Sequence, residues 1–165
     1  MTAHSYFVTC PRNTEGLLLD ELRSLGAADA AETRAGVRFS GPLSLAYRAC
    51  LWSRVASRVL LQLASFQVSD VEDIYSAVGE IPWEDHLVAT GSLAVEVTTA
   101  ISQGPLAHLN THFAKQRVKD AIVDRYRQRL GSRPSVDLVR PDIRVDLHLA
   151  PAEAVVSLDV YDRST

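Results

Sequence analysis

The sequence lacks the glycine patterns that cofactor-binding and phosphate-binding loops require. Its eight glycines never form a Gly-x-Gly, which excludes the glycine-rich turn of a dinucleotide or S-adenosylmethionine fold and also a P-loop. An Asn-Pro-Pro-aromatic motif is impossible, because the only asparagines are Asn13 and Asn110. The chain also has no Gly-x-Ser-x-Gly, no His-Glu-x-x-His and no metal-spaced Cys/His set. We therefore do not expect this chain by itself to be an enzyme.

Cysteine is scarce and long apolar runs are absent. Cys10 and Cys50 are the only cysteines and have no paired spacing, which fits a reducing compartment. The first residues lack the positive and apolar regions of a signal peptide. The longest apolar stretches fall far short of the roughly 18 residues that a membrane span needs. These absences predict a cytoplasmic protein that does not cross a membrane.

What remains is the composition of a globular protein. The chain has 165 residues, of which 47% are hydrophobic and 22% charged. A chain of this length buries roughly 70% of its unfolded surface, so it needs no metal or disulfide to stabilise it. Its cations are 15 arginines and 2 lysines. This excess of arginine suits phosphate recognition, although genome base composition explains it at least as well.

Residues 1–66 show a regular alternation of strand and helix patterns. A helix is expected from Thr14 to a stop at Gly26, and a second over Leu43–Leu51. Strand patterns cover four segments, Ser5–Cys10, Ala28–Thr33, Gly36–Ser40 and Ala56–Val68. The order strand, helix, strand, strand, helix, strand is the ferredoxin-like βαββαβ arrangement.

Residues 67–165 form a second α/β unit in this interpretation, so the predicted fold class is α+β. Helices are expected over Val71–Gly79, with Ser69 or Asp70 as N-cap, and over Thr111–Leu130, which Gly131 ends. Three strands are expected, with a turn at Gln103–Pro105 after the first: Gly91–Ile101, Asp142–Leu149 and Glu153–Val160. Since the chain stops just after this last strand, we expect a fragment or a small stand-alone module.

Charge is unevenly distributed in the second unit. Residues 67–100 contain seven acids and no Lys or Arg, whereas residues 101–144 contain nine Lys/Arg and four acids. The segment from Lys115 to Arg133 alone has seven cations against two aspartates in a chain of net charge −3. A cationic helix in an acidic protein predicts a locally positive surface, for which polyanions are the usual partner.

The long helix places two lysines near its apolar side. At 100° per residue, one apolar seam contains Val118, Ile122, Tyr126 and Leu130. Lys115 and Lys119 fall on the N-terminal extension of that seam. Either they line a groove for an anion, or their stems cover apolar surface while their ammonium groups reach water. Four arginines near the helix end are expected to be solvated: Arg125, Arg127, Arg129 and Arg133.

Other candidate residues have simpler interpretations. His108 and His112 have the spacing of two metal ligands but lack a third, so an ordinary helix start is favoured. The pairs Glu72-Asp73 and Glu84-Asp85 are interpreted as a solvated face. Trp52 and Trp83 are interpreted as core anchors, with base stacking as the alternative. Arg54 and Arg58 would share a face if the second helix continued through them, and either phosphate binding or a structural salt bridge fits them.

Five segments of the sequence together resemble a known family. They occur in the order PRNTEGLLLDELRSLGA, GVRFSG, LWSRVASRVLL, QRVKDAIVD and PDIRVDLHL. In this order they are similar to the N-terminal region of bacterial large-subunit ribosomal RNA guanine-N2-methyltransferases. In that family a ferredoxin-like domain, here residues 1–66, and a THUMP domain, here residues 67–165, precede a Rossmann-like methyltransferase domain.

The resemblance implies that the THUMP unit binds structured RNA, namely 23S rRNA, without a membrane or DNA as partner. Methyl transfer from S-adenosylmethionine would belong to a catalytic domain in cis that this sequence does not include. No catalytic or metal-binding residue and no cofactor is therefore assigned to this chain. The matching basic residues are Lys119, Arg144, Arg54 and Arg58, with Lys115 and Arg117 beside the motif. The alternative is a non-catalytic interaction domain whose basic helix docks an acidic partner.

Overall fold

A computed structural model describes residues 3–34, 36–99, 110–151 and 153–160. The chain divides into two compact units. Unit 1 comprises Met1–Gln62 and Leu158–Thr165, and unit 2 comprises Leu63–Ser157. The two strands that cross this boundary, β4 (Arg58–Gln67) and β8 (Glu153–Asp159), contribute residues to both units. Among the described residues, none of the helices has the length and apolar content needed to cross a bilayer.

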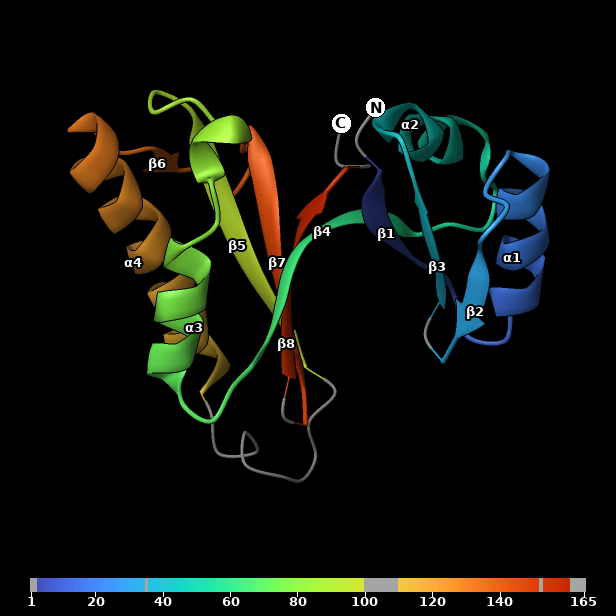
Figure 1. Cartoon of the computed structure of the whole chain (residues 1–165), viewed down its shortest axis with the longest axis horizontal. Coiled ribbons are helices and arrows are strands. Elements are labelled where there is room, and N and C mark those ends of the chain that lie inside the picture. The colour runs from blue at the N-terminus through green and yellow to red at the C-terminus, as the bar shows by residue number, and fades with distance from the viewer. Residues whose placement is uncertain (1–2, 35, 100–109, 152, 161–165) are drawn as a thin grey trace. The chain divides into compact units, whose positions relative to one another are not determined.

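Unit 1 is an antiparallel sheet covered by two helices (Figure 1). Its strands lie in the order β2-β3-β1-β4, and the end of β8 joins β4 where the Val160 amide donates to the Val59 carbonyl at 2.8 Å. In chain order the elements are β1 (His4–Thr9), α1 (Glu15–Ser24), β2 (Ala31–Thr33), β3 (Gly36–Gly41), α2 (Leu43–Trp52) and β4 (Arg58–Gln67).

The sequence pattern explains the core of unit 1. Tyr6 and Val8 alternate with more exposed residues along β1 and are fully buried. Tyr6 pairs with Phe39 of β3, and their rings stack with centroids 5.1 Å apart. Gly36 permits this close strand pairing, since a Cβ atom there would lie 2.0 Å from the Val8 carbonyl oxygen.

Unit 2 contains a sheet in which β5 runs parallel to both of its neighbours. The strand order is β8-β7-β5-β6, and α4 makes the crossover that a parallel pair requires. The elements that follow β4 are α3 (Val71–Gly79), the 3-10 helix η1 (Trp83–Asp85), β5 (Ser92–Thr99), α4 (Thr111–Leu130), β6 (Ser135–Val136), β7 (Ile143–Ala150) and β8 (Glu153–Asp159).

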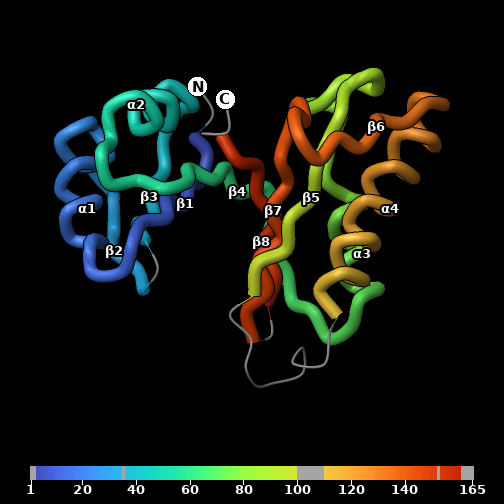
Figure 2. Tube along the Cα trace, turned by 180° about the vertical axis from the view of Figure 1, so that it is seen from behind, coloured from blue at the N-terminus to red at the C-terminus, as the bar shows by residue number. Residues whose placement is uncertain are grey.

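Helices α3 and α4 lie side by side against this sheet (Figures 1 and 2). Helix α3 begins with a capping box, in which the Asp70 carboxylate accepts from the amides of Glu72 and Asp73 and Asp73 accepts in return from Asp70. Trp83 is fully buried beneath the helices, and its indole N–H donates to the Val78 carbonyl at 2.8 Å. The core-anchor interpretation of Trp83 is confirmed, whereas that of Trp52 is wrong because this side chain is exposed.

The predicted fold class is confirmed, a ferredoxin-like unit followed by an α/β unit. Helices α3 and α4 have the predicted bounds. The predictions missed β6 and η1, since elements of two or three residues are too short to show a periodicity. The predicted turn at Gln103–Pro105 and the candidate ligand His108 lie outside the described residues.

Candidate nucleic-acid interface

Helix α4 carries most of the candidate residues, and its ends explain its length. The Asn110 side chain caps the start by accepting from the amides of His112 and Phe113. Gly131 ends the helix with a left-handed φ of 71°. With 3.6 residues per turn, the helix presents three sides. One faces the sheet, one faces α3, and one flank points away from α3.

The side that faces the sheet is the predicted apolar seam. Val118, Ile122 and Tyr126 are buried there. The Tyr126 hydroxyl donates to the carbonyls of Trp83, at 2.9 Å, and Leu87, which fixes α4 to the segment before β5. The prediction is wrong for Leu130, which is exposed in the final turn of the helix.

On the side that faces α3, Arg117 is held by protein groups. Its guanidinium lies 3.0 Å from the Glu72 carboxylate and 3.2 Å from the Asp120 carboxylate. It also stacks over the Tyr75 ring at 4.2 Å from the centroid. Arg117 therefore ties α3 to α4, and its guanidinium is already engaged by two carboxylates.

Arg125 forms a second tie between α4 and the segment after α3. Its Nε and Nη2 donate to the two Glu84 oxygens at 2.8 and 2.7 Å, and its Nη1 donates to the Gly79 carbonyl at 2.8 Å. These hydrogen bonds lower the pKa of Glu84 from 4.5 to about 2. Arg129 lies at 4.0 Å from the same carboxylate. The prediction that Arg125 is solvated is wrong, because its side chain is largely buried in this pair.

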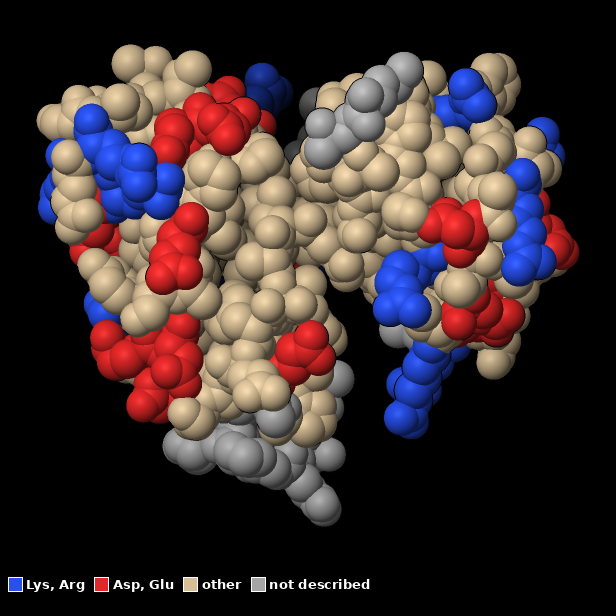
Figure 3. All heavy atoms as spheres, viewed as in Figure 1, with Lys and Arg blue, Asp and Glu red and all other residues tan. Residues whose placement is uncertain are grey.

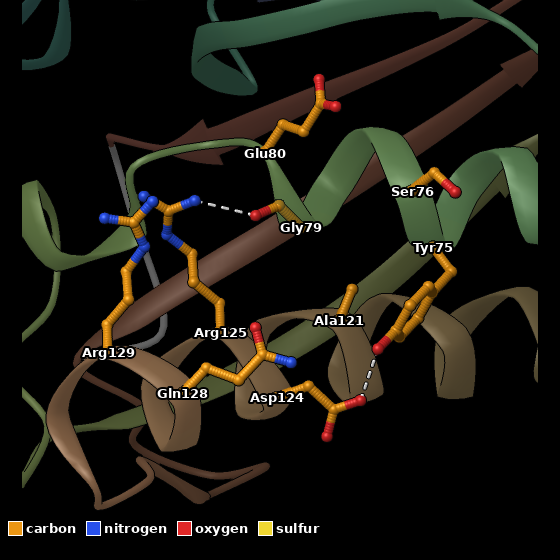
Figure 4. Close-up of a pocket in the computed structure, with 9 residues that line it drawn as sticks. All are labelled: Tyr75, Ser76, Gly79, Glu80, Ala121, Asp124, Arg125, Gln128 and Arg129. Carbon is orange, nitrogen blue, oxygen red and sulfur yellow. Dashed lines mark hydrogen bonds between the residues drawn. The ribbon is translucent and has the colours of Figure 1, made fainter.

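A pocket of about 420 Å³ lies between α3 and α4 beside this pair (Figure 4). Tyr75, Asp124, Arg125 and Arg129 are among the residues that line it. The Tyr75 hydroxyl donates to Asp124 at 2.6 Å, and this bond raises the pKa of Tyr75. Asp124 and the buried Arg125 guanidinium already have partners, and Glu80 adds an acid to the lining, so the pocket offers little net attraction for an anion.

The acidic segment 67–100 thus forms ion pairs with the basic segment 101–144 within unit 2. Glu72 of the acidic segment pairs with Arg117 of the basic one, and Glu84 pairs with Arg125. Their interpretation as a solvated face is wrong for Glu84, and Asp73 acts as a helix cap. Figure 3 shows what stays on the surface of unit 2, with acids over the start of α3 and cations over the end of α4.

Lys115 and Lys119 are different, because they lie on the flank of α4 that points away from α3. Both are half-buried. Among the described residues, no carboxylate oxygen lies within 4.0 Å of either ammonium nitrogen, which is the limit for an ion pair. Lys115 lines a pocket of about 370 Å³ with Glu96, Val97 and His112. The half-burial of both lysines fits a groove for an anion and equally fits stems that cover apolar surface. Unlike Arg117 and Arg125, the two lysines have no carboxylate partner among the described residues.

Arg144 lies on β7, next to β5. In the parallel register it pairs with Ala94, so its side chain shares a face of the sheet with Glu96. Its guanidinium lies 3.9 Å from the Glu96 carboxylate and 3.4 Å from the Val139 carbonyl. Glu96 thus lies near two of the candidate RNA-binding residues. It contacts Arg144, and it lines the same pocket as Lys115.

Arg54 and Arg58 belong to unit 1 and do not share a helix face. Helix α2 ends at Trp52, and Arg58 already starts β4. The Arg58 Nε lies 3.1 Å from an Asp159 oxygen, which is the structural salt bridge that the sequence left open. Arg54 is exposed, and its backbone amide donates to Glu21 at 3.1 Å.

One further basic residue of α4 lies outside the lysine row. Arg127 follows Lys119 by eight residues, which places it about 80° round the helix axis from Lys119, on the polar face with Asp120. Its side chain is exposed and has no carboxylate partner among the described residues. The sequence predicted that Arg127 is solvated with the other arginines near the helix end, and its exposure confirms this.

Two family profiles match the chain in succession. The profile of the THUMP domain matches residues 68–159, more than half of the chain. The chain belongs to the THUMP family. A profile described as the RlmL ferredoxin-like domain matches residues 5–60. The resemblance inferred from the sequence is therefore confirmed, and the THUMP domain comprises the elements from α3 to β8.

A relative with a descriptive name and two solved structures match nearly the whole chain. "Ribosomal RNA large subunit methyltransferase K/L" of Syntrophotalea carbinolica is 51% identical over 94% of this chain and 21% of its own length. A putative methyltransferase complexed with SAH has a TM-score of 0.83 at 21% identity, covering 96% of this chain and 42% of that one. A predicted N6-adenine-specific DNA methylase from Listeria monocytogenes has a TM-score of 0.81 at 23% identity. This match covers 96% of this chain and 40% of that one.

The chain spans about a fifth of the length of the curated relatives that it matches. Both solved structures are below 25% identity, so they support the fold of this THUMP-containing chain and not its activity.

Proposed function

We propose that this chain is the RNA-binding part of an S-adenosylmethionine-dependent ribosomal RNA methyltransferase. It would hold structured 23S rRNA while a methyltransferase domain elsewhere in a longer cytoplasmic protein modifies guanine N2. The observation that carries the proposal is that the RlmL ferredoxin-like profile and the THUMP profile match this chain one after the other. The name of the relative at 51% identity supports it, and S-adenosylmethionine would be bound by the catalytic domain and not by this chain.

We assign the RNA contact to the flank of α4 that carries Lys115 and Lys119, with Arg127 on the neighbouring polar face as a further cation. These three cations have no carboxylate partner among the described residues, so an RNA phosphate would not compete with an existing ion pair. Successive positions in a row of four-residue spacing lie about 6 Å apart along a helix. Such a row suits contact with the RNA backbone, which contributes affinity and orientation more than sequence readout.

Arg117 and Arg58 have a smaller role in this proposal. Each is engaged by a carboxylate at 3.0–3.1 Å, and a phosphate would have to displace that partner. Arg54 remains a candidate because its side chain is exposed, and Arg144 remains one because it matches the PDIRV segment of the family. We therefore expect the two lysines to contribute more to RNA affinity than Arg117.

The test is an RNA-binding titration of the double variant Lys115→Glu/Lys119→Glu with a hairpin from large-subunit rRNA. Counterion release gives a slope of about −0.7 to −0.9 per phosphate contact in a plot of log K against log salt. Loss of two contacts should reduce the slope by about 1.6 and the affinity at 0.1 M salt by roughly 30-fold. Fluorescence of the buried Trp83 checks that unit 2 is still folded.

A matched control makes the same change of charge at another place. Arg12→Glu/Arg34→Glu alters two exposed arginines of unit 1 and should leave the affinity within about three-fold. Equal losses in both double variants would mean that net charge, and not the α4 flank, sets the affinity. Unchanged binding in the lysine variant would refute the assignment of the interface.

A chemical experiment reads the same flank directly. Lys115 and Lys119 are the only lysines in the chain, so an amine-acetylating reagent reports on these two side chains and the N-terminus. Hairpin RNA should slow their acetylation. Protection by an acidic protein but not by RNA would favour the alternative function, an interaction domain for an acidic partner.

A further inference from the structure

The outer face of α2 in unit 1 exposes an unusual set of apolar side chains. Leu43, Tyr47 and Leu51 are spaced by four residues and form one row along the helix. Trp52, the last residue of the helix, is also exposed but lies about 100° round the helix axis from Leu51. Their exposed fractions range from 39% for Leu43 to 78% for Leu51. We call these four residues the α2 outer face.

This exposure does not come from an incompletely packed helix. Leu45, Ala46 and Ala49 on the opposite side of α2 are buried against the core. The end of the helix is held by Glu21 of α1, whose carboxylate accepts from the Ser53 hydroxyl at 2.6 Å and from the following amide at 3.1 Å. The α2 outer face is therefore presented in a fixed conformation.

The area of the α2 outer face exceeds what scattered exposed residues usually leave. Single exposed apolar side chains are normal on soluble proteins. Here four large ones occur within ten residues of one helix and together leave on the order of 400 Å² of apolar surface, which is the size of patches that mark interaction sites. A surface of this kind gains free energy when a partner removes it from water.

The chemistry of the face favours a protein over RNA. Two of its four residues are leucines, which offer neither stacking nor hydrogen bonds to a base. Arg48 lies on the same helix, but its Nη1 donates to the Leu25 carbonyl at 2.9 Å. A nucleic-acid platform needs free cations between its aromatic residues, and α2 itself contains no cation besides Arg48.

The area also distinguishes between kinds of protein partner. A stable complex of separate molecules buries about 800 Å² on each partner, roughly twice what this face provides. A second copy of the chain would therefore bind weakly. A partner tethered in the same polypeptide acts at an effective concentration of about millimolar and needs less area. The relatives that the chain matches are almost five times as long, so such a tether is available in them.

We infer that the α2 outer face is an intramolecular docking surface for another folded domain of the longer protein. The inference shares with the proposed function only the premise that the chain is part of a longer polypeptide. It assigns the two units different tasks. Unit 1 attaches to the protein's other domain through the apolar side chains of α2, and the main contact with RNA is made by the lysines of unit 2.

Hydroxyl-radical footprinting tests this surface in the 165-residue chain and in the longer protein. Oxidation of Trp52 and Tyr47 should be at least about five-fold slower in the longer protein, as for side chains that an interface excludes from water. Leu17 on α1 is exposed and serves as the unprotected reference, whereas the fully buried Trp83 should be protected in both. Equal oxidation of Trp52 in both proteins would overturn the inference.

Other results also decide the question. Protection already present in the dilute 165-residue chain would mean that the chain covers the face itself. Protection that grows with its concentration would identify a second copy, and protection that requires hairpin RNA would identify an RNA surface. Each of these overturns the docking surface but leaves the lysine titration unaffected, so this inference and the proposed function can fail separately.

A variant gives an independent readout. Leu51→Glu in the longer protein should speed limited proteolysis between its domains by several-fold, because a buried charge opposes docking. Leu17→Glu introduces the same charge at an exposed position outside the face and should have no such effect. Equal proteolysis rates for both variants and the unmodified protein would contradict the inference even where the variants fold normally.

Discussion

The pair between Arg125 and Glu84 allows a quantitative prediction for the variant Glu84→Gln. Two parallel N–H···O bonds of 2.8 and 2.7 Å join the side chains, which are only 10% and 29% exposed. The glutamine side chain would keep the shape of the glutamate but not its charge. The Arg125 guanidinium would then remain largely buried without a counter-ion, which is the costly part of the substitution.

The magnitude follows from the pKa of Glu84. Lowering this pKa from 4.5 in the unfolded chain to about 2 in the folded one corresponds to about 3 kcal/mol of stability. Solvent screens the partly exposed carboxylate, so we expect Glu84→Gln to lower the free energy of unfolding by about 2 kcal/mol at pH 7.

The sign of the pH dependence is fixed by the direction of the shift. A carboxyl group with a depressed folded-state pKa stabilises the protein above its unfolded-state pKa, and this stabilisation is lost as the pH falls toward the folded-state value. More than half of the difference between the native protein and Glu84→Gln should therefore be lost between pH 7 and pH 3, most of it below pH 4.5, with little change between pH 7 and pH 5.

Urea unfolding followed by tryptophan fluorescence measures this difference. Trp83 is fully buried in unit 2, whereas Trp52 is exposed, so the change in emission reports mainly on unit 2. Glu80→Gln is the matched control, because Glu80 lines the same pocket but is exposed and has no ion pair among the described residues. A difference below about 0.5 kcal/mol at pH 7, or one that is the same at pH 3, would refute the reasoning.

Two further predictions concern unit 1 and can be measured by thermal or urea unfolding. Tyr6→Phe should leave stability unchanged or raise it by up to about 1 kcal/mol, since the buried Tyr6 hydroxyl has no hydrogen-bond partner among the described residues; a loss above about 1 kcal/mol would reveal a partner. Gly36→Ala should destabilise the sheet by more than about 2 kcal/mol, because its Cβ would lie 2.0 Å from the Val8 carbonyl oxygen. Gly16→Ala, where no atom lies within 4 Å, is the control and should not destabilise the protein in this way.

The sequence predicted the long elements because their local signals agree. Helix α4 has an asparagine cap before it, a spacing of apolar residues inside it and a glycine after it, and it was placed with its observed bounds. Helix α3 was found in the same way from its cap and its apolar residues. Strand β6 was missed because two residues carry no period, and its pairing with β5 depends on a crossover between distant segments.

The candidate site was only partly predictable. The sequence identified α4 and its two lysines, and the family explained their context. It named Arg117 as an RNA-binding candidate and Arg125 as a solvated cation, because it does not tell which acids face them. Glu72 and Glu84 lie 45 and 41 residues away along the chain and become partners only when α3 packs against α4.

What the sequence by itself determined is the order of elements, the family and the total charge of each segment, since these depend on periodicity, caps and composition along the chain. The tertiary structure decided which charges remain available. The packing of α3 on α4 neutralises Arg117 and Arg125 and leaves Lys115 and Lys119 without a carboxylate partner among the described residues. The physical reason is that the energy of an ion pair depends on separation in space and on burial, and neither is a property of position in the sequence.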